Sequence, residues 1–202
     1  MTRLFVVRHG QTDWNVQGRL QGSSDIPLND AGRAQAAAAA ATLGLALRPG
    51  FTLVSSPLSR ARETAEILVA SLGQGEVELD DRLVERSYGV WEGLASAERA
   101  ARYPAENARW EARDEPNIDG YESHEVVAAR MREAAYNWVA RVDGDLVFVT
   151  HGSSARMLTE VLLGLPSGGH TIGNLENAAW SRLRQVIDGP WSLERHNVGA
   201  RN

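Results

Sequence analysis

The strongest constraint on the fold of this chain is a repeated change between short apolar runs and helical segments. Four apolar runs of strand length, each bounded by polar residues, lie at residues 4–7, 51–55, 77–79 and 146–150. Stretches with helical spacing lie at residues 31–45, 58–72, 122–142 and 153–163. This alternation predicts an α/β fold of three layers, with helices on both faces of a doubly wound, mostly parallel sheet.

Three segments depart from this alternation. Residues 8–28 carry too many glycines and prolines for a regular element, and we expect a long ordered loop there. Residues 92–122 are polar, aromatic and rich in arginine, and we expect a short helical excursion over the site. Residues 178–187 and 191–197 predict a closing hairpin around residues 188–190. A chain of 202 residues, 43% of them hydrophobic, is expected to form a single domain over residues 1–202.

Composition excludes several kinds of chemistry. The chain has no cysteine, which rules out disulfides, thiolate metal sites and a cysteine nucleophile. All 21 basic residues are arginine, so Schiff-base chemistry and a Walker-type phosphate loop are excluded as well. The net charge of −5 gives no sign of nucleic-acid binding, and no apolar stretch approaches the roughly 20 residues of a membrane span. We expect a cytoplasmic protein with neither a membrane nor a nucleic acid as partner.

Three clusters of polar residues each come directly after a predicted strand. They read Arg-His-Gly at residues 8–10, Ser-Ser-Pro-Leu-Ser-Arg at 55–60 and Thr-His-Gly at 150–152. If these strands are parallel neighbours, their carboxyl ends meet at one edge of the sheet. The topology then brings four side chains into one crevice: Arg8, His9, Arg60 and His151.

This crevice would suit a phosphate dianion. It holds two permanent positive charges and two imidazoles, without an acidic trio to bind a metal, and guanidinium groups match phosphate oxygens well. A neutral imidazole of His9 would attack phosphorus and form a covalent intermediate. Arg8 and Arg60 would lower the pKa of His9 by like-charge repulsion and neutralise the oxygens of the transferring group.

Further groups are needed to complete this chemistry. We expect His151 to donate to the phosphoryl oxygens as charge develops on them, and Gly10 and Gly152 to let the backbone approach the anion closely. An acid must also protonate the departing alkoxide and then, as a base, activate water against the phosphohistidine.

Several motifs together resemble one known family. Residues 8–12 and 14–15, Arg-His-Gly-Gln-Thr and Trp-Asn, resemble the R-H-G signature of the histidine phosphatase, or phosphoglycerate mutase-like, superfamily. Further pieces occur in the family's order, namely Ser-Ser-Pro at 55–57, Leu-Val-Glu-Arg at 83–86, Trp-Glu-Gly at 91–93 and Thr-His-Gly at 150–152. The resemblance covers about residues 4–165 and implies phosphoryl transfer through a phosphohistidine, with no metal and no cofactor.

The resemblance also implies roles for individual residues. Glu85 matches the position of the general acid and base. Asn15, Gln21 and Gly22 match positions that touch the phosphate or line its entrance, and Arg86 and Tyr88 would contact the leaving group. Purely structural roles stay open, because Asn15, Gln21 and Gly22 suit a plain turn. Arg86 and Tyr88 suit ordinary packing.

Several of the charged residues also have possible partners close by in the sequence. Glu85 could pair with Arg82 or Arg86, and Glu92 lies near it as a rival acid. Arg60 could lie on a helix surface and pair with a neighbouring glutamate. Trp110 and the arginines around it would contact a sugar or an acidic substrate, or form a solvated helix face.

The resemblance covers more than one reaction. Phosphoglycerate mutases carry a longer excursion and lysines around the substrate, whereas this chain has a short excursion, no lysine and Ser87 in place of the family's histidine. These departures favour a phosphatase acting on a small phosphorylated metabolite or sugar, with a cofactor-dependent mutase as the alternative. A third hypothesis is a phosphate-sensing module without turnover, which would not need His9 or Glu85.

The carboxyl-terminal part of the chain narrows the substrate. Residues 173–180, Gly-Asn-Leu-Glu-Asn-Ala-Ala-Trp, are similar to a stretch of actinobacterial phosphatases that act on glucosyl-3-phosphoglycerate. A broad-specificity acid phosphatase is the competing interpretation. The resemblance further implies a homodimer, which many relatives form.

Overall fold

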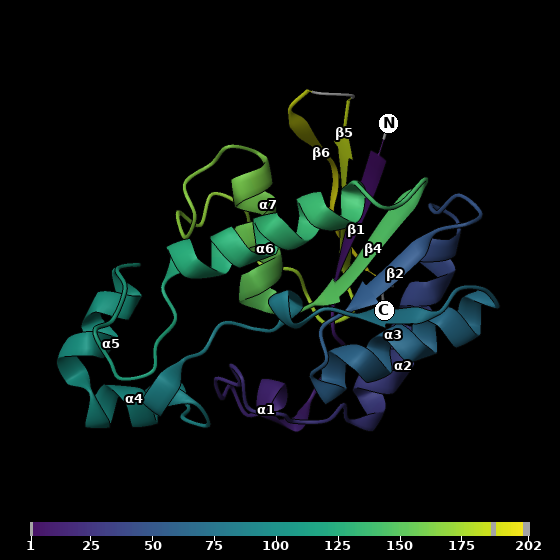
Figure 1. The fold of residues 1–202 in the computed structure, drawn as a ribbon. Helices are drawn as coiled ribbons and strands as arrows, with labels where there is room; N and C mark the ends of the chain where they lie inside the picture. The colour runs from purple at the N-terminus through teal and green to yellow at the C-terminus, as the bar shows by residue number, and fades with distance from the viewer. Residues whose placement is uncertain (1, 187–188, 200–202) are drawn as a thin grey trace.

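A computed structural model of the chain describes residues 2–186 and 189–199 (Figure 1). The strands are β1 Thr2–Arg8, β2 Thr52–Ser55, β3 Val77–Leu79, β4 Asp145–Thr150, β5 Trp180–Gln185 and β6 Trp191–Val198. The helices are α1 Asp13–Val16, α2 Asp30–Gly44, α3 Ser59–Leu72, α4 Ser96–Arg102, α5 Pro104–Glu111, α6 His124–Val139 and α7 Gly152–Leu162. Single 3-10 turns lie at Asp81–Leu83 and Gly89–Trp91. Among the described residues, no helix has the length and apolar character needed to cross a bilayer.

The six strands form one mixed sheet in the order β3-β2-β4-β1-β5-β6. The first four are parallel to one another, and β5 and β6 are antiparallel to their neighbours. The predicted α/β fold with a mostly parallel sheet is therefore confirmed. The closing hairpin is the pair β5 and β6, and its predicted turn lies partly outside the described residues, which leave out 187 and 188.

Helices cover both faces of the sheet, as the alternation predicts (Figure 1). On one face, Leu4 and Val6 of β1 join a buried cluster with residues of α6 and α7 such as Met131. On the other face, Phe5 and Val7 join a second cluster with the alanines and leucines of α2 and α3. Successive side chains of a strand point to opposite faces, so one continuous apolar run fills two cores.

The register of the parallel strands places the predicted polar clusters at one edge. Arg8 lies opposite Thr150, and Ser55 lies opposite Val149, so β1, β4 and β2 end at the same level. The turns that follow these strands therefore begin side by side. This geometry brings the Arg-His-Gly, Ser-Ser-Pro and Thr-His-Gly segments together.

A buried carboxylate lies at the opposite end of the parallel strands, where β4 begins. The side chain of Asp145, at the start of β4, is fully buried and accepts hydrogen bonds from the guanidinium groups of Arg3 and Arg48. The backbone amide of Arg48 donates to it as well, at 2.7 Å. Burial raises the pKa of Asp145, but these hydrogen bonds outweigh burial and hold the pKa below its ordinary value of 3.8.

We expect Asp145→Asn to lower the free energy of unfolding by about 3 kcal/mol at neutral pH, because two arginines lose their buried partner. The matched control is Asp30→Asn, which breaks an exposed pair with Arg33 and should cost less than about 1 kcal/mol. Because the folded pKa of Asp145 is lowered, its contribution is complete above the unfolded pKa and is lost as pH falls through the folded pKa. Urea unfolding at several pH values measures both effects, and equal losses in the two variants would contradict the prediction.

The predicted loop at residues 8–28 contains one element that was missed. Residues 13–16 form the short helix α1, and Thr12 begins it with a capping box in which Thr12 and Asn15 exchange hydrogen bonds. The prediction of an unbroken loop was therefore wrong at this point. The helix forms because the Thr-x-x-Asn pattern satisfies its first amide groups, despite the surrounding glycines.

The excursion consists of α4, α5 and the segments around them, beside the main body in Figure 1. Tyr88, Trp91 and Leu94 form a small buried cluster of their own, against which Trp110 and Tyr121 pack. Trp110 meets Tyr88 and Trp91 edge-on, with ring centroids 5.8 and 5.9 Å apart. The aromatic composition of this segment therefore serves a satellite core, which supports Tyr88 from behind.

Candidate active site

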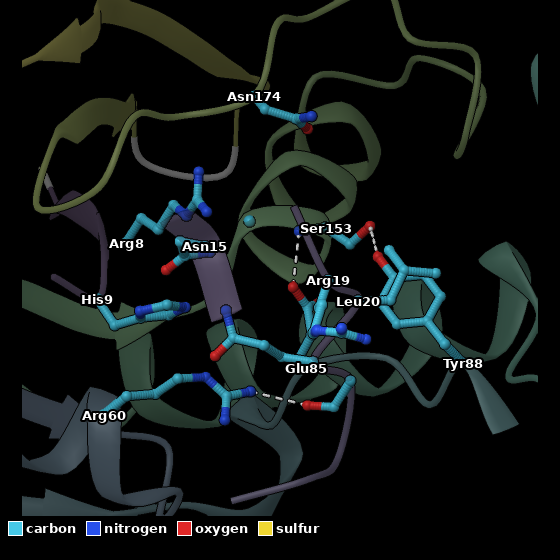
Figure 2. Close-up of a pocket in the computed structure, with 13 residues that line it drawn as sticks. Arg8, His9, Asn15, Arg19, Leu20, Arg60, Glu85, Tyr88, Ser153 and Asn174 are labelled. Atoms are coloured by element: carbon cyan, nitrogen blue, oxygen red, sulfur yellow. Dashed lines mark hydrogen bonds between the residues drawn. The ribbon is translucent and has the colours of Figure 1, made fainter. Parts of the chain in front are cut away.

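A cavity of about 160 Å³ opens at the carboxyl edge of β1, β4 and β2. Figure 2 shows Arg8, His9 and Arg60 on one side of it and Glu85, Tyr88 and Ser153 on the other. The residues that line it are Arg8, His9, Asn15, Arg19, Leu20, Gln21, Gly22, Arg60, Glu85, Tyr88, Gly152, Ser153 and Asn174. We call this cavity the phosphoryl pocket.

His9 presents an unprotonated nitrogen to this pocket. Its Nδ1 lies 2.6 Å from the carbonyl oxygen of Gly10, and a carbonyl only accepts, so Nδ1 carries the proton. Nε2 is then left with its lone pair. Burial is the largest cause that lowers the pKa of His9 well below 6.5, and the positive charges of Arg60 and then Arg8 lower it further. The geometry therefore keeps the imidazole neutral, with a free lone pair on Nε2.

Arg60 is held firmly in the pocket wall. Its side chain is fully buried, and its Nη1 and Nη2 donate to the carbonyl oxygens of Ser24 and Gly22 at 2.8 and 2.7 Å. Its Nε donates to Nδ1 of His151 at 3.2 Å. Each terminal nitrogen keeps one further N–H, so Arg60 retains donors for an anion without having to move.

Arg8 supplies the second guanidinium group. Its Nη1 donates to the carbonyl oxygen of Leu175 at 2.7 Å, while its buried Nε has no acceptor among the described residues. Gly152 lies against it, and a Cβ at that position would stand 3.5 Å from the Nε. The unpaired N–H of Arg8 is therefore available to an oxygen atom bound in the pocket.

His151 is placed differently from the expectation. It does not line the pocket, although its ring centroid lies 5.2 Å from that of His9. A guanidinium group only donates, so Nδ1 of His151 accepts from Arg60, and Nε2 carries the proton and donates to Oγ of Ser56 at 2.9 Å. Both nitrogens thus have protein partners, and His151 orients Arg60; its donation to a phosphoryl oxygen stays a prediction.

Glu85 is fixed at the amino-terminal end of α7. Its Oε1 accepts from the amide of Arg86 and from the amide and hydroxyl groups of Ser154, at 2.9 to 3.0 Å. Its Oε2 accepts only from the amide of Ser153, at 3.0 Å, among the described residues. Oε2 is consequently the oxygen with capacity to hold and release a proton toward the pocket.

Glu92 has a structural task instead. Its two oxygens accept from the amide and hydroxyl groups of Ser23 and Ser24, at 2.6 to 2.9 Å, and it does not line the pocket. Gly22 has a φ of +57°, and a Cβ there would lie 2.1 Å from Glu92. The carboxylate therefore holds the turn whose carbonyl oxygens anchor Arg60. This separation of tasks favours Glu85 over Glu92 as the acid.

Asn15 is oriented by a residue from the far end of the chain. Its Oδ1 accepts from the backbone amide of Thr12 and from Nδ2 of Asn177, at 3.0 and 3.2 Å. The Nδ2 group of Asn15 is therefore turned toward the pocket as a donor. Asn177 also donates to the carbonyl oxygens of His9 and Gly10, at 3.2 Å each, and so fixes the backbone that carries His9.

Comparison with known proteins places the chain in a family. The model of the histidine phosphatase superfamily (branch 1) matches residues 4–199. The chain belongs to the histidine phosphatase superfamily. It is 38% identical over 200 residues to glucosyl-3-phosphoglycerate phosphatase of Mycobacterium tuberculosis, which covers 94% of this chain and 86% of that protein. It is 32% identical over 199 residues to the metal-independent phosphoserine phosphatase of Arabidopsis thaliana, with 97% and 83% covered.

A solved structure gives the same result. The mycobacterial glucosyl-3-phosphoglycerate phosphatase complexed with VO3 superposes on this histidine phosphatase with a TM-score of 0.87. The two are 37% identical, and the match covers 98% of this chain and 99% of the other. Both the fold and the family are thereby confirmed.

Most of the residues singled out in the sequence of this histidine phosphatase come together. Nine of them line the pocket: Arg8, His9, Asn15, Gln21, Gly22, Arg60, Glu85, Tyr88 and Gly152. His151 stands behind it, and Arg86 points into a different cavity, so a direct contact of Arg86 with the leaving group in this pocket does not follow. Four lining residues were missed: Arg19, Leu20, Ser153 and Asn174. Ser153 had a signal in its place after the Thr-His-Gly cluster, and Asn174 in its place within the stretch at residues 173–180 that resembles other phosphatases.

The two glycines of the signature differ in how closely other parts of the protein approach them. A Cβ on Gly10 would lie 2.3 Å from the carbonyl oxygen of Gly32, at the start of α2, so Gly10 is required by helix packing. A Cβ on Gly152 would make only ordinary contacts with Arg8. Gly152 lines the pocket, and close approach of the backbone to an anion stays a prediction for both residues.

The acidic and imidazole side chains of the described residues do not form a cluster of metal ligands. Across residues 2–186 and 189–199, no three His, Asp or Glu side chains gather into a group that could hold an ion. Guanidinium groups carry the positive charge around the pocket, and they suit an anion.

The electrostatics of His9 lead to a pH prediction. We expect its imidazole to remain neutral at about pH 6, where an ordinary histidine is mostly protonated. Burial and the positive charges of Arg8 and Arg60 destabilise the imidazolium, so protonation requires a lower pH. ¹⁵N NMR of histidine-labelled protein, titrated from neutral to acidic pH, follows Nε2 directly. Arg60→Gln should raise the pKa of His9, and a wild-type titration near the ordinary value would contradict the prediction.

Proposed function

We propose that this chain is a phosphomonoester hydrolase that works through a phosphohistidine on Nε2 of His9. Nε2 attacks phosphorus, an N–P bond forms, and the P–O bond to the leaving alcohol breaks. Glu85 gives its proton to the departing oxygen. A water molecule then attacks phosphorus and gives a proton to Glu85, a new P–O bond forms, and the N–P bond breaks, so that inorganic phosphate leaves and Nε2 regains its lone pair.

One observation carries this proposal: the free lone pair on Nε2 of a buried, neutral His9 faces the same small cavity as two guanidinium groups and the carboxylate of Glu85 (Figure 2). The guanidinium groups are placed to neutralise charge on the transferring oxygens without reorganisation. Glu85 lies across the cavity from His9, as in-line displacement of a leaving group requires.

The reaction class rests on the relatives as well as on the site. The relatives named glucosyl-3-phosphoglycerate phosphatase and metal-independent phosphoserine phosphatase are matched over 86% and 83% of their length, and their names favour water over a second substrate as the acceptor. A mutase of the phosphoglycerate type is the second candidate, because Arg86 and Tyr88 follow the acid as they do in that branch. We further propose that no metal ion takes part.

The substrate proposal is a phosphorylated derivative of glyceric acid. Relatives named for glucosyl-3-phosphoglycerate support it. We expect kcat/KM for glucosyl-3-phosphoglycerate to exceed that for phosphoserine and for glycerol 3-phosphate by at least about tenfold, which corresponds to about 1.4 kcal/mol. Phosphate release from this panel at matched concentrations, with and without EDTA, measures both preference and metal dependence. Equal rates across the panel would indicate a broad-specificity phosphatase.

The mutase hypothesis has its own test. 3-Phosphoglycerate is incubated with and without 2,3-bisphosphoglycerate as a primer, and the isomers are separated from free phosphate. We expect free phosphate and no primer-dependent 2-phosphoglycerate. Isomerisation that depends on the primer would overturn the hydrolase assignment but retain the role of His9.

A further inference from the structure

Gly10 carries the carbonyl group that fixes the tautomer of His9, because Nδ1 of His9 donates to its oxygen at 2.6 Å. Glycine has no side chain to restrict its backbone, so the peptide groups on either side of Gly10 turn more freely than those of other residues. The direction of this carbonyl group therefore has to be fixed by the surroundings. Side chains from three separate segments, Gln35, Thr64 and Asn177, bind these two peptide groups.

Thr64 holds the peptide group between His9 and Gly10. It lies on α3 with its side chain fully buried. Its Oγ1 accepts from the amide of Gly10 at 3.0 Å and donates to the carbonyl oxygen of Arg60 at 2.7 Å. A carbonyl group only accepts, so the hydroxyl proton points to Arg60 and a lone pair is left for the amide of Gly10. One hydroxyl group thus links the backbone beside His9 to the helix that carries Arg60.

Asn177 holds both peptide groups at once. Its Nδ2 lies 3.2 Å from the carbonyl oxygens of His9 and Gly10, and 3.2 Å from Oδ1 of Asn15. Carbonyl oxygens only accept, which places the nitrogen of the Asn177 amide at this point, and not its oxygen. The backbone amide of the next residue, Ala178, also donates to the carbonyl oxygen of His9, at 3.0 Å. Asn177 therefore contacts the backbone on both sides of Gly10 and the anion donor Asn15.

Gln35 binds the other end of the second peptide group. It lies on α2, and its Oε1 accepts from the backbone amide of Gln11 at 2.9 Å. The peptide group between Gly10 and Gln11 is therefore held by α2 at its amide and by Asn177 at its carbonyl oxygen. We call Gln35, Thr64 and Asn177 the backbone clamp.

Loss of the backbone clamp would act on the reacting atom. If the carbonyl group of Gly10 turned away, Nδ1 of His9 would lose the acceptor that keeps the proton on it. An imidazole that carries its proton on Nε2 has no lone pair there to form a bond to phosphorus. Even with the tautomer unchanged, a shift of the ring by about 1 Å lowers a reaction rate by about 10²-fold.

We propose that Thr64 and Asn177 are positioning residues for His9, which hold the Gly10 carbonyl group as the acceptor that keeps the lone pair on Nε2. This inference rests on the proposed function, in which Nε2 attacks phosphorus. Neither residue lines the phosphoryl pocket, so both act through other groups. Asn177 has a second task, because it also orients Asn15, which lies on the same side of the pocket as His9 (Figure 2).

The first experiment detects the tautomer of His9 and needs no turnover, so its result is independent of the proposed phosphatase activity. ¹⁵N NMR of histidine-labelled protein at neutral pH distinguishes a protonated Nδ1 from a protonated Nε2, and the spectrum of His9→Ala identifies the His9 signals. We expect a protonated Nδ1 in the wild type and a mixture of the two tautomers in Thr64→Val and in Asn177→Ala. The wild-type tautomer in both variants would overturn the proposal.

Thr159→Val is the matched control for Thr64→Val. Thr159 is a buried threonine of α7 whose hydroxyl group donates to the carbonyl oxygen of Ala155 at 2.8 Å, four residues before it, as that of Thr64 does to Arg60. Among the described residues, its hydroxyl group accepts from no backbone amide, so the control should keep the tautomer and the turnover of the wild type. Thr64→Ser retains the hydroxyl group and should restore most of both properties.

Asn137→Ala is the matched control for Asn177→Ala. Asn137 is a half-buried asparagine of α6 whose amide nitrogen lies 3.4 Å from Glu133 of the same helix. Asn177→Ala also keeps the test valid if Thr64→Val, which leaves a buried amide without an acceptor, fails to fold. Circular dichroism and thermal unfolding show which variants are folded.

The second experiment separates the two tasks of Asn177. With p-nitrophenyl phosphate, Thr64→Val should lower kcat about tenfold and leave the Kd for inorganic phosphate within about twofold, because Asn15 keeps its partner. Asn177→Ala should lower kcat by at least about tenfold and also raise this Kd about fivefold. A kcat within about twofold of the wild type in both variants would overturn the proposal, and an unchanged Kd in Asn177→Ala would remove its second task.

Failure of this inference differs from failure of the proposed function. If the backbone clamp does not position His9, then His9→Ala is inactive, whereas Thr64→Val and Asn177→Ala keep the tautomer and the kcat of the wild type. If His9 is not the nucleophile, the two variants still change its tautomer, but His9→Ala retains turnover.

Discussion

His9→Ala is expected to lower kcat/KM for p-nitrophenyl phosphate by about 10⁴-fold or more, because the covalent route disappears with the nucleophile. p-Nitrophenolate leaves readily without protonation, so this measurement reports the nucleophile and depends little on the acid. The pocket keeps both guanidinium groups in the variant, since Arg60 is anchored by the carbonyl oxygens of Gly22 and Ser24 and not by His9. The variant should therefore still bind inorganic phosphate.

Three measurements make the His9 result specific. The enzyme is mixed with a substrate labelled in its phosphoryl group and rapidly quenched with alkali, under which phosphohistidine survives. The label should be found on the wild-type protein and not on the variant. Thermal unfolding should change little, and phosphate binding should persist. His196→Ala is the matched control, because this histidine lies on β6, away from the phosphoryl pocket. If the His9→Ala variant turned over substrate at a rate close to that of the wild type, His9 would not be the nucleophile.

Glu85→Gln is expected to separate poor leaving groups from good ones. Protonation by a placed acid contributes about 10² to 10⁴-fold, and alkyl phosphates depend on it far more than p-nitrophenyl phosphate does. With p-nitrophenyl phosphate, the first step should stay fast while hydrolysis of the phosphohistidine slows, because the base for water is missing. The expected result is a burst of p-nitrophenolate followed by slow turnover, and a fall of about 10³-fold in kcat/KM for glycerol 3-phosphate.

Glu92→Gln is the control that distinguishes an acid from a structural carboxylate. Glu92 anchors residues 22–24, which anchor Arg60, so its loss should raise KM for good and poor leaving groups alike. In Glu85→Gln the amide replaces one acceptor oxygen near the amides of Ser153 and Ser154, and circular dichroism and thermal unfolding check that α7 stays in place. Equal losses on all leaving groups in Glu85→Gln would argue against the acid role.

Much of this fold could be predicted because local sequence specifies local structure. The apolar runs of β1, β2 and β4 have the length of buried strands, and Asn29, Ser123 and Gly73 lie at helix ends as caps. The prediction failed at α1, where a capping box outweighed the surrounding glycines. It was also imprecise for the excursion, whose aromatic residues form a cluster with partners on several separate segments.

The candidate site divides in the same way. Arg8, His9, Arg60 and Glu85 could be selected because each lies in a motif directly after a strand or in the family's order. Asn177 and Asn174 lie in the stretch at residues 173–180 that carries part of the resemblance, but their contacts could not be predicted, because their partners, His9 and Arg156, are distant in sequence.

The sequence by itself determined which kinds of side chain lie at the carboxyl ends of the strands: arginine, histidine and glutamate. Residue identity and the alternation of strands and helices are both local properties of the chain. Only the tertiary structure decided the tautomer of His9, the different hydrogen-bond partners of Glu85 and Glu92, and the hydrogen bond between His151 and Arg60. These properties depend on which donor or acceptor stands within about 3 Å of each atom. Segments far apart in the chain supply those partners, so they exist only once the sheet has brought the segments together.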